Sequence, residues 1–290
     1  MLPKFFVFVL LFIPVPAYRC VNFYGLEVPQ KKFVCSWVHE PKWYLEKMKK
    51  LIKIDSVRIP FSYEYASCSD FRELDNFIRD CQNLEISVIL DYHRGYSDHQ
   101  GPSPVENGIT KAMWIDMLIH VLERYHDQPH VKAITLFNEF QGTDYMTWQA
   151  MQLEAVTSLE DIFPGRYEYM LGCVDWGKDC SNMWNKVPNE RSYIEIHSYG
   201  FGLGRYPNNR NKIFVGEIGW RANETSNFQE FKTIVRKRRI RDICLWTVAH
   251  SDDTKSLFQN DCETVNTDIQ NDFNSLFDWN NISCLRGSKI

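Results

Sequence analysis

The chain has 290 residues, of which 44% are hydrophobic and 24% are charged, and its formal net charge is −4. This composition is typical of a folded globular protein with a large core. The small negative charge argues against nucleic acid or an anionic membrane surface as a partner.

The first residues have the pattern of a secretory signal peptide. Lys4 precedes an apolar run over residues 5–13, and small residues up to Ala17 fit the cleavage rule. This run is too short to span a hydrocarbon core of about 30 Å, so an uncleaved anchor is the weaker interpretation. We therefore expect residues 1–17 to be removed and a soluble, secreted protein to start at Tyr18.

The remaining chain alternates short apolar runs, which are typical of buried strands, with segments of helical periodicity. The predicted strands cover residues 19–26, 56–61, 86–91, 133–140, 167–173, 193–197, 213–217 and 243–246. The predicted helices cover residues 43–54, 71–81, 114–125, 148–162 and 228–235. A loop rich in glycine, proline and serine over residues 95–108 is long enough to carry function.

Strands that alternate with helices predict a parallel sheet, and eight such strands predict closure into a (β/α)₈ TIM barrel. We expect residues 18–290 to form this barrel as a single domain. The unit between residues 197 and 217 should be abbreviated, because it leaves little room for a helix. Six chemically interesting residues lie at or near strand ends, where such barrels place their active sites: Arg58, His93, Glu139, His197, Glu217 and Trp246.

Nine cysteines fit an exported protein, because disulfides persist in oxidising compartments. Cys173 with Cys180 and Cys262 with Cys284 are plausible pairs, although spacing does not determine connectivity. The odd number leaves at least one thiol, and Cys244 is a candidate for a buried free one. Two glycosylation sequons indicate surface positions: Asn223 and Asn281.

Two of the predicted strands deliver a glutamate. AITLFNEF, over residues 133–140, runs from an apolar segment into Asn138 and Glu139, and IFVGEIGW, over residues 213–220, reaches Glu217. Carboxylates on different strand ends of one sheet can face each other across a cleft. Glycoside hydrolysis requires this geometry.

The chain resembles a glycoside hydrolase of family 5, the cellulase family of retaining (β/α)₈ glycosidases. Six motifs in the family's order carry the resemblance: VRIP, LDYH, LFNE, IHSY, GEIG and LWT, which begin at residues 57, 90, 136, 196, 216 and 245. Phe140 departs from the family pattern, which usually has proline after the Asn-Glu pair. The resemblance implies hydrolysis of a β-linked polysaccharide, of the β-glucan or β-mannan type, by a monomer without metal or organic cofactor.

The resemblance also implies roles for individual residues. Glu139 becomes the general acid/base and Glu217 the nucleophile of a retaining mechanism. Arg58 would hold Glu217 ionised, and Tyr199 could donate a second hydrogen bond to it.

The other implied residues bind substrate. Asn138 would hydrogen-bond to the sugar 2-hydroxyl, and Trp246 would stack under the cleaved sugar. His93 and His197 would bind sugar hydroxyls or tune Glu139.

Competing interpretations are weaker. Taken singly, these residues have ordinary structural roles, such as a rim salt bridge for Arg58. His120 and His126 do not share a helix face, which disfavours a metal site, and residues 200–204 lack the third glycine of a dinucleotide loop. The basic run 236–239 is interpreted as the solvated end of a helix.

A second function stays open. The chain could be a barrel that keeps a carbohydrate-binding cleft without turnover, as a lectin-like protein in host or cell-surface interaction. The intact Glu139 and Glu217 pair argues against this alternative, because binding alone does not need two partly desolvated carboxylates.

Overall fold

The computed structural model describes residues 18–67, 70–183, 187–199, 204–207, 212–221, 224–249 and 256–278. The expected signal peptide, both sequons and Cys284 lie outside the described residues. None of the helices in these ranges combines the length and the hydrophobicity that crossing a bilayer requires.

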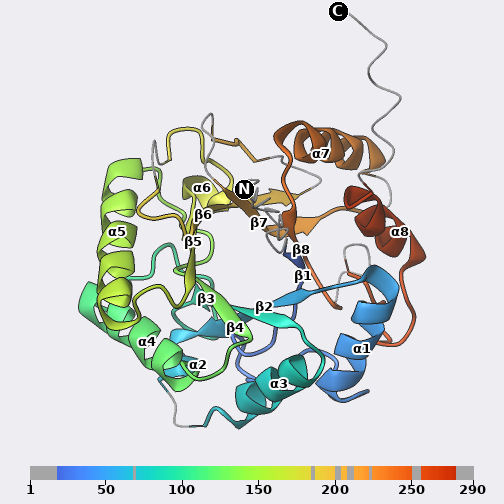
Figure 1. Cartoon of the computed structure of the whole chain (residues 1–290), viewed down its shortest axis with the longest axis horizontal. Helices are drawn as coiled ribbons and strands as arrows, with labels where there is room; N and C mark the ends of the chain where they lie inside the picture. The colour runs from blue at the N-terminus through green and yellow to red at the C-terminus, as the bar shows by residue number, and fades with distance from the viewer. Residues whose placement is uncertain are drawn as a thin grey trace, which may run out of the picture.

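Eight parallel strands close into a barrel in sequence order, with β8 hydrogen-bonded back to β1. They are β1 (Arg19–Asn22), β2 (Ser56–Ser62), β3 (Ser87–Arg94), β4 (Val131–Thr135), β5 (Glu168–Gly172), β6 (Ser192–Tyr199), β7 (Ile213–Gly219) and β8 (Asp242–Leu245). Figure 1 shows the strands at the centre and the longer helices around them. The predicted (β/α)₈ TIM barrel is therefore confirmed.

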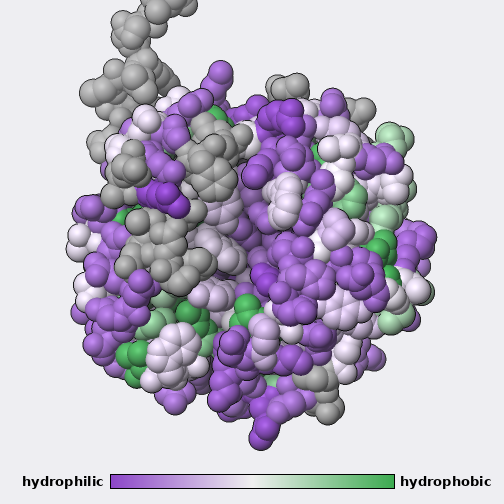
Figure 2. All heavy atoms as spheres, turned by 180° about the vertical axis from the view of Figure 1, so that it is seen from behind, coloured by the Kyte–Doolittle hydropathy of each residue, from purple (hydrophilic) through white to green (hydrophobic). Residues whose placement is uncertain are grey.

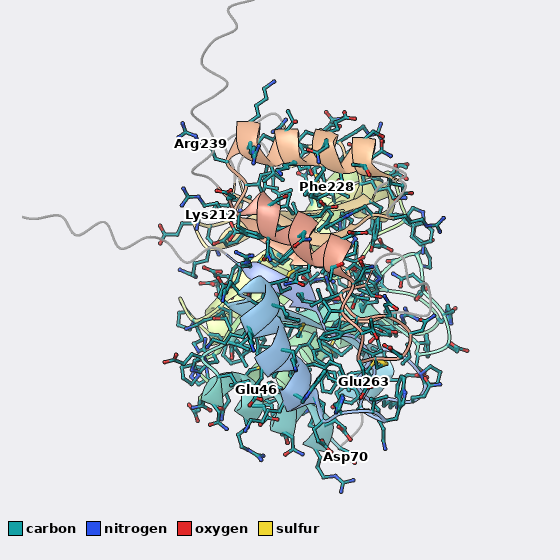
Figure 3. The ribbon with its side chains drawn as sticks, turned by 90° about the vertical axis from the view of Figure 1, so that its right-hand side faces the viewer. Glu46, Asp70, Lys212, Phe228, Arg239 and Glu263 are labelled. Atoms are coloured by element: carbon teal, nitrogen blue, oxygen red, sulfur yellow. A yellow bond between two sulfur atoms is a disulfide. The ribbon has the colours of Figure 1, made fainter. Side chains whose placement is uncertain are left out.

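Helices follow the strands, and the longer ones cover the outside of the barrel (Figure 1). They are α1 (Pro41–Ile52), α2 (Tyr63–Ala66), α3 (Arg72–Asn83), α4 (Lys111–Arg124), α5 (Tyr145–Ile162), α6 (Val174–Gly177), α7 (Thr225–Arg238) and α8 (Thr267–Leu276). Five of them match predicted helices with shifted ends, whereas α2, α6 and α8 were not predicted. Figure 3 shows α7, α8 and α1 following one another along one side. The described residues between β6 and β7 (204–207 and 212) contain no helix.

The helices form because apolar side chains recur at helical spacing and find the barrel to pack against. In α4, Trp114, Leu118 and Val121 are buried toward the core, and Thr110 caps the helix by accepting a hydrogen bond from the backbone N–H of Met113. The large core cluster lies between strands and helices. The outer surface in Figure 2 is mostly hydrophilic, with hydrophobic residues in scattered groups.

The inside of the barrel has an apolar floor, which consists of Tyr18, Cys20, Ile89, Ala133, Met170, Tyr193, Phe214 and Cys244. Side chains alternate along a strand, so residues two positions further along also face inward. In several strands these next positions are polar and buried: Asn22, Asp91, Thr135 and Glu195. The barrel therefore changes from apolar to polar along its axis, in the direction in which the strands run.

Three disulfides join described residues. The predicted Cys173–Cys180 pair is confirmed. Cys262 pairs with Cys35, so the pairing of Cys262 with Cys284 was wrong.

The prediction that Cys244 is free was also wrong, because it pairs with Cys20. Cys20 and Cys244 are register partners on β1 and β8, which become neighbours only when the barrel closes. Within the described ranges, the free buried cysteine is Cys81.

Candidate active site

The eight residues that the sequence assigned to the site form one connected group inside and above the barrel. Hydrogen bonds, ion pairs and ring contacts link each of them to at least one other member. They are Arg58, His93, Asn138, Glu139, His197, Tyr199, Glu217 and Trp246. They come from six strands or the segments that follow them.

Arg58 lies at the centre of the group and is fully buried. Its Nη1 donates to Oε1 of Glu217 at 3.1 Å, and its Nη2 donates to Oδ1 of Asn138 at 2.8 Å. Asp91 and Glu195 also lie within 3.0 Å of the guanidinium. Burial opposes the charge of Arg58, but the surrounding carboxylates outweigh it and raise its pKa.

Glu217 points into the barrel because β7 carries one extra residue. Between β6 and β7 the register passes from Ile196 opposite Val215 to His197 opposite Glu217, which leaves Gly216 unpaired as a bulge. The Glu217 carboxylate is only 3% exposed and accepts hydrogen bonds from Arg58 and from the hydroxyl of Tyr199. These two donors hold the carboxylate in a fixed orientation.

Glu139 lies nearer the surface. Strand β4 ends at Thr135, earlier than predicted, and the chain continues to Glu139, whose φ of 51° places it in the left-handed region. Its side chain is 18% exposed, so it can reach a ligand in the opening. The next residue, Phe140, stacks on Trp148 with ring centroids 4.6 Å apart. Phe140, which stands where the family usually has proline, therefore contributes a ring contact to the packing of this loop.

The imidazole of His197 lies between three carboxylates. Its Nδ1 is 3.0 Å from Glu139 and 3.6 Å from Glu217, and its Nε2 is 3.4 Å from Glu195. Burial works against a charged ring, but these carboxylates raise the pKa of His197 to about 10. His197 is thus an imidazolium at neutral pH and can donate a proton at each ring nitrogen.

The two candidate catalytic carboxylates are close. One oxygen of Glu139, one oxygen of Glu217 and a ring nitrogen of His197 lie within 4.8 Å of one another. This spacing alone would also suit three metal ligands. However, Arg58 and Tyr199 already donate hydrogen bonds to the two oxygens of Glu217, so this carboxylate suits anion chemistry better than metal binding.

His93 and Trp246 form the opposite wall. Nδ1 of His93 is 2.7 Å from Oδ2 of Asp91, and burial keeps the pKa of His93 well below its usual value. The Trp246 ring stacks on His93 at 5.6 Å and on Tyr24 at 5.9 Å. Tyr24 also lines a hollow of about 300 Å³. Its other lining residues are Val34, Cys35, Trp37, Ala249, Asn260 and Cys262.

Sequence reasoning missed four buried polar residues that hold this group in place: Asn22, Asp91, Thr135 and Glu195. Asp91 and Glu195 each stand two positions before a site histidine on the same strand, and residues two apart share a face. That spacing was a usable signal. Asn22 and Thr135 had no such signal, because they act through contacts to residues on other strands, among them Arg58 and Glu195.

Residues 21–281 match the family model described as cellulase, glycosyl hydrolase family 5. Endoglucanase C of Acetivibrio thermocellus is 24% identical to the chain over 131 residues. The aligned part is 41% of this chain and 38% of that protein, so the chain spans well under half the length of this curated relative.

Solved structures share the fold. The catalytic domain of the major endoglucanase from Xanthomonas campestris pv. campestris has a TM-score of 0.78 at 19% identity, with 90% of this chain and 95% of that chain covered. An endocellulase from Pyrococcus horikoshii in complex with cellotetraose has a TM-score of 0.77 at 15% identity, with 90% and 92% covered. At such identities the likeness concerns the fold.

Proposed function

The chain belongs to glycosyl hydrolase family 5, the cellulase family, and from this premise we propose that it is an endoglucanase-like enzyme that cleaves β-glucans with retention of configuration. The observation that carries the proposal is the distance of at most 4.8 Å between oxygens of Glu139 and Glu217. Retaining enzymes hold their two carboxyl groups about 5 to 5.5 Å apart, whereas inverting enzymes need about 6.5 to 9.5 Å.

The proposed reaction has two steps. Glu139 first gives its proton to the glycosidic oxygen while the Glu217 carboxylate attacks the anomeric carbon, so the glycosidic bond breaks and a glycosyl ester forms. Glu139 then takes a proton from water, which attacks the same carbon and releases Glu217. The two carboxylates suit these roles because Glu217 is deep and held by Arg58, whereas Glu139 lies at the opening.

The neighbouring residues support both steps. His197 presents a positive charge to Glu139 and Glu217 and would stabilise each carboxylate whenever it is ionised. Asn138, held by Arg58, would bond to the sugar 2-hydroxyl, and Trp246 would stack under the sugar ring.

We also propose that the enzyme acts outside the cell. The support is the signal-peptide pattern before Tyr18 together with three disulfides among the described residues. The polymer is proposed as a β-glucan because the relatives are named as endoglucanases. A β-mannan is the second substrate to test.

The test is release of reducing sugars from cellulose, lichenan, laminarin, mannan and xylan by the mature protein and by Glu217→Gln. This variant removes the nucleophile's charge at nearly constant volume, so we expect a loss on the order of a thousand-fold or more with the fold retained. The matched control is Glu154→Gln, the same chemical change at an exposed residue of α5 that pairs with Lys111 of α4, and it should leave the rate unchanged.

Glu139→Ala separates the two roles in the same assay. It should slow polymer hydrolysis by about 10²- to 10⁴-fold but affect aryl glycosides with activated leaving groups much less. Equal losses on both substrates would contradict an acid role for Glu139. Undiminished activity of Glu217→Gln would contradict the whole mechanism, and sugar binding without hydrolysis by the parent would favour the lectin-like alternative.

A further inference from the structure

The floor of the barrel holds a second group of charged residues, at the opposite end from the active site. In Figure 3, Lys212 directly precedes β7 and marks the end at which strands begin, whereas Glu263, in the connection after β8, marks the other end. Tyr18 directly precedes β1 and is 7% exposed. Its ring packs edge-on against Tyr193 and Phe214, with centroids 6.3 and 6.1 Å away.

Every polar group of Tyr18 is engaged at this floor. Its hydroxyl donates to Glu168, and its carbonyl accepts from the backbone N–H of Ile243 at 2.8 Å. Its backbone nitrogen donates to Oδ1 of Asp242 at 2.8 Å. The position of this nitrogen is thus determined by a side chain, a strand pairing and a carboxylate.

Negative charge is in excess around this nitrogen. Burial, together with the nearby carboxylates of Glu168 and Asp55, raises the pKa of Asp242 to about 6, although the hydrogen bond from the Tyr18 backbone and the charge of Lys212 act in the opposite direction. Lys212, however, donates to the backbone carbonyl of Glu190 at 2.8 Å and lies over the Tyr193 ring.

Arg19 follows Tyr18 in the chain, and its guanidinium also has partners elsewhere. It donates to Asn274 and stacks over Phe277 at 4.4 Å. Among the described residues, no lysine or arginine side chain makes a salt bridge to Asp242 that would balance the local charge.

We propose that cleavage after Ala17 creates an α-ammonium group on Tyr18. This group forms an ion pair with Asp242 and stabilises the folded barrel at the end where its strands begin. Hydrolysis by a signal peptidase adds one water across the Ala17–Tyr18 bond, so Ala17 keeps a carboxylate and the Tyr18 nitrogen becomes a cation. The nitrogen already lies at hydrogen-bonding distance from Asp242, so the pair forms without rearrangement. A charged donor binds a carboxylate more strongly than a neutral amide does.

The proposal does not depend on the enzymatic activity. Its consequence is that the processed chain is more stable than the precursor. Because the pair is partly buried, it is weakly screened by salt compared with an exposed pair.

The test compares two purified, oxidised chains that begin at Tyr18 or at Pro14, the first released from a fusion by a protease that leaves Tyr18 as the amino terminus. At pH 7 we expect the Tyr18 chain to melt about 2 to 4 °C or more above the Pro14 chain. Asp242→Asn should abolish this difference. The matched control is Asp55→Asn, since Asp55 accepts the backbone N–H of Arg19 at 2.8 Å, which stays an amide in both chains, and the difference should persist.

Two further measurements keep the proposal testable if Asp242→Asn does not fold. The difference in melting temperature should be largest between about pH 6, the raised pKa of Asp242, and about pH 8, the usual α-amino pKa. It should decline at lower pH as Asp242 is protonated, and vanish as pH rises through the raised pKa of the paired amine. The secreted protein should begin at Tyr18 by intact mass. Equal melting temperatures, a difference that survives in Asp242→Asn, or a mature start at another residue would each overturn the proposal.

Discussion

Arg58 organises the interior of the site, because one buried guanidinium contacts Asp91, Glu195 and Glu217. Removing such a group would leave three carboxylates facing one another in a poorly solvated space. The pKa values of the carboxylates around Arg58 shift in opposite directions. Burial raises the pKa of Asp91 to about 7, whereas Arg58 and His197 overcome the effect of burial on Glu195 and lower its pKa.

Glu195, two positions before His197 on β6, influences the charge and the orientation of the His197 ring. It is 2% exposed, and its carboxylate also accepts a hydrogen bond from Thr135 at 2.7 Å. His197 presents its other nitrogen to Glu139 and Glu217. The orientation and the charge of the imidazole that faces the cleft thus depend on a carboxylate that no substrate would touch.

We predict that Glu195→Gln lowers the pKa of His197 from about 10 toward neutrality, because one of the carboxylates that stabilise the imidazolium becomes neutral. Ring chemical shifts of His197 measured by NMR against pH check this directly. Glu195→Asp, which keeps the charge, is the matched control and should titrate near the parent. Identical titration curves for parent and Glu195→Gln would show that Glu195 does not control the ring.

The same shift has a consequence for stability. A histidine whose pKa is raised from about 6.5 to about 10 contributes stability that is complete below pH 6.5 and is lost as pH rises toward 10. Parent stability should therefore fall more steeply than that of Glu195→Gln across this pH window.

Among the strands, β7 does the most to shape the site, because its bulge brings Glu217 opposite His197. The bulge requires glycine for a reason of space. A Cβ on Gly216 would lie 2.0 Å from Oε1 of Glu195. The carbonyl of Gly216 also accepts a hydrogen bond from Asn22 at 2.9 Å, which ties the bulge to β1.

We predict that Gly216→Ala destabilises the protein by about 1 to 3 kcal/mol, the usual range for overpacking, and lowers activity by moving Glu195 and Glu217. Urea denaturation and the sugar-release assay measure the two effects. Gly95→Ala is the control, because its new Cβ would first meet the end of the Ile109 side chain at 3.0 Å. Combining Gly216→Ala with Glu195→Ala should recover part of the stability loss, and full additivity would contradict this explanation.

The segment after β5 supports the opposite side of the opening. The Cys173–Cys180 disulfide closes a short loop in which Asp175 and Trp176 both have left-handed backbones. The backbone N–H of Trp176 donates to the carbonyl of Phe140 at 3.0 Å, next to Glu139. Gly177 lies against the His197 ring, so this loop contacts both the segment that carries Glu139 and the histidine beside it.

At the scale of the molecule, two disulfides join the ends of the chain. Cys20–Cys244 spans 224 residues and Cys35–Cys262 spans 227, whereas Cys173–Cys180 spans 7. A cross-link restricts the unfolded chain more when the closed loop is longer. The two long-range bridges fasten β1 and its following loop to β8 and its following loop, at the seam where the barrel closes.

We predict that replacing Cys20 and Cys244 by alanine together costs about 2 to 5 kcal/mol in the free energy of unfolding. Replacing Cys173 and Cys180 should cost less, because the loop that they close is short. Thermal or denaturant unfolding of both double variants and the parent, under oxidising conditions, measures this. Equal losses would argue against loop length as the dominant cause.

Much of this protein could be predicted from the sequence alone, because the decisive signals were local. The spacing of apolar residues predicted alternating strands and helices, and hence the barrel. The positions of Arg58, Glu139 and Glu217 at strand ends predicted that they lie in one region. The matching family motifs, now supported by the family match over residues 21–281, named the eight residues that lie together. The four-residue elements α2 and α6 were missed, since so few residues give too weak a periodic pattern. The helix α8 was missed although Ile269, Phe273 and Leu276 recur at helical spacing.

The tertiary structure decided what depends on contacts between distant parts of the chain. The partners of Cys244 and Cys262 follow from closure of the barrel, which brings β8 beside β1. The bulge at Gly216 and the network of Asn22, Thr135 and Glu195 around Arg58 depend on how neighbouring strands align. A sequence records which residues can bond, but which ones do so is determined by register and closure of the sheet, because hydrogen bonds and ion pairs form only at short range.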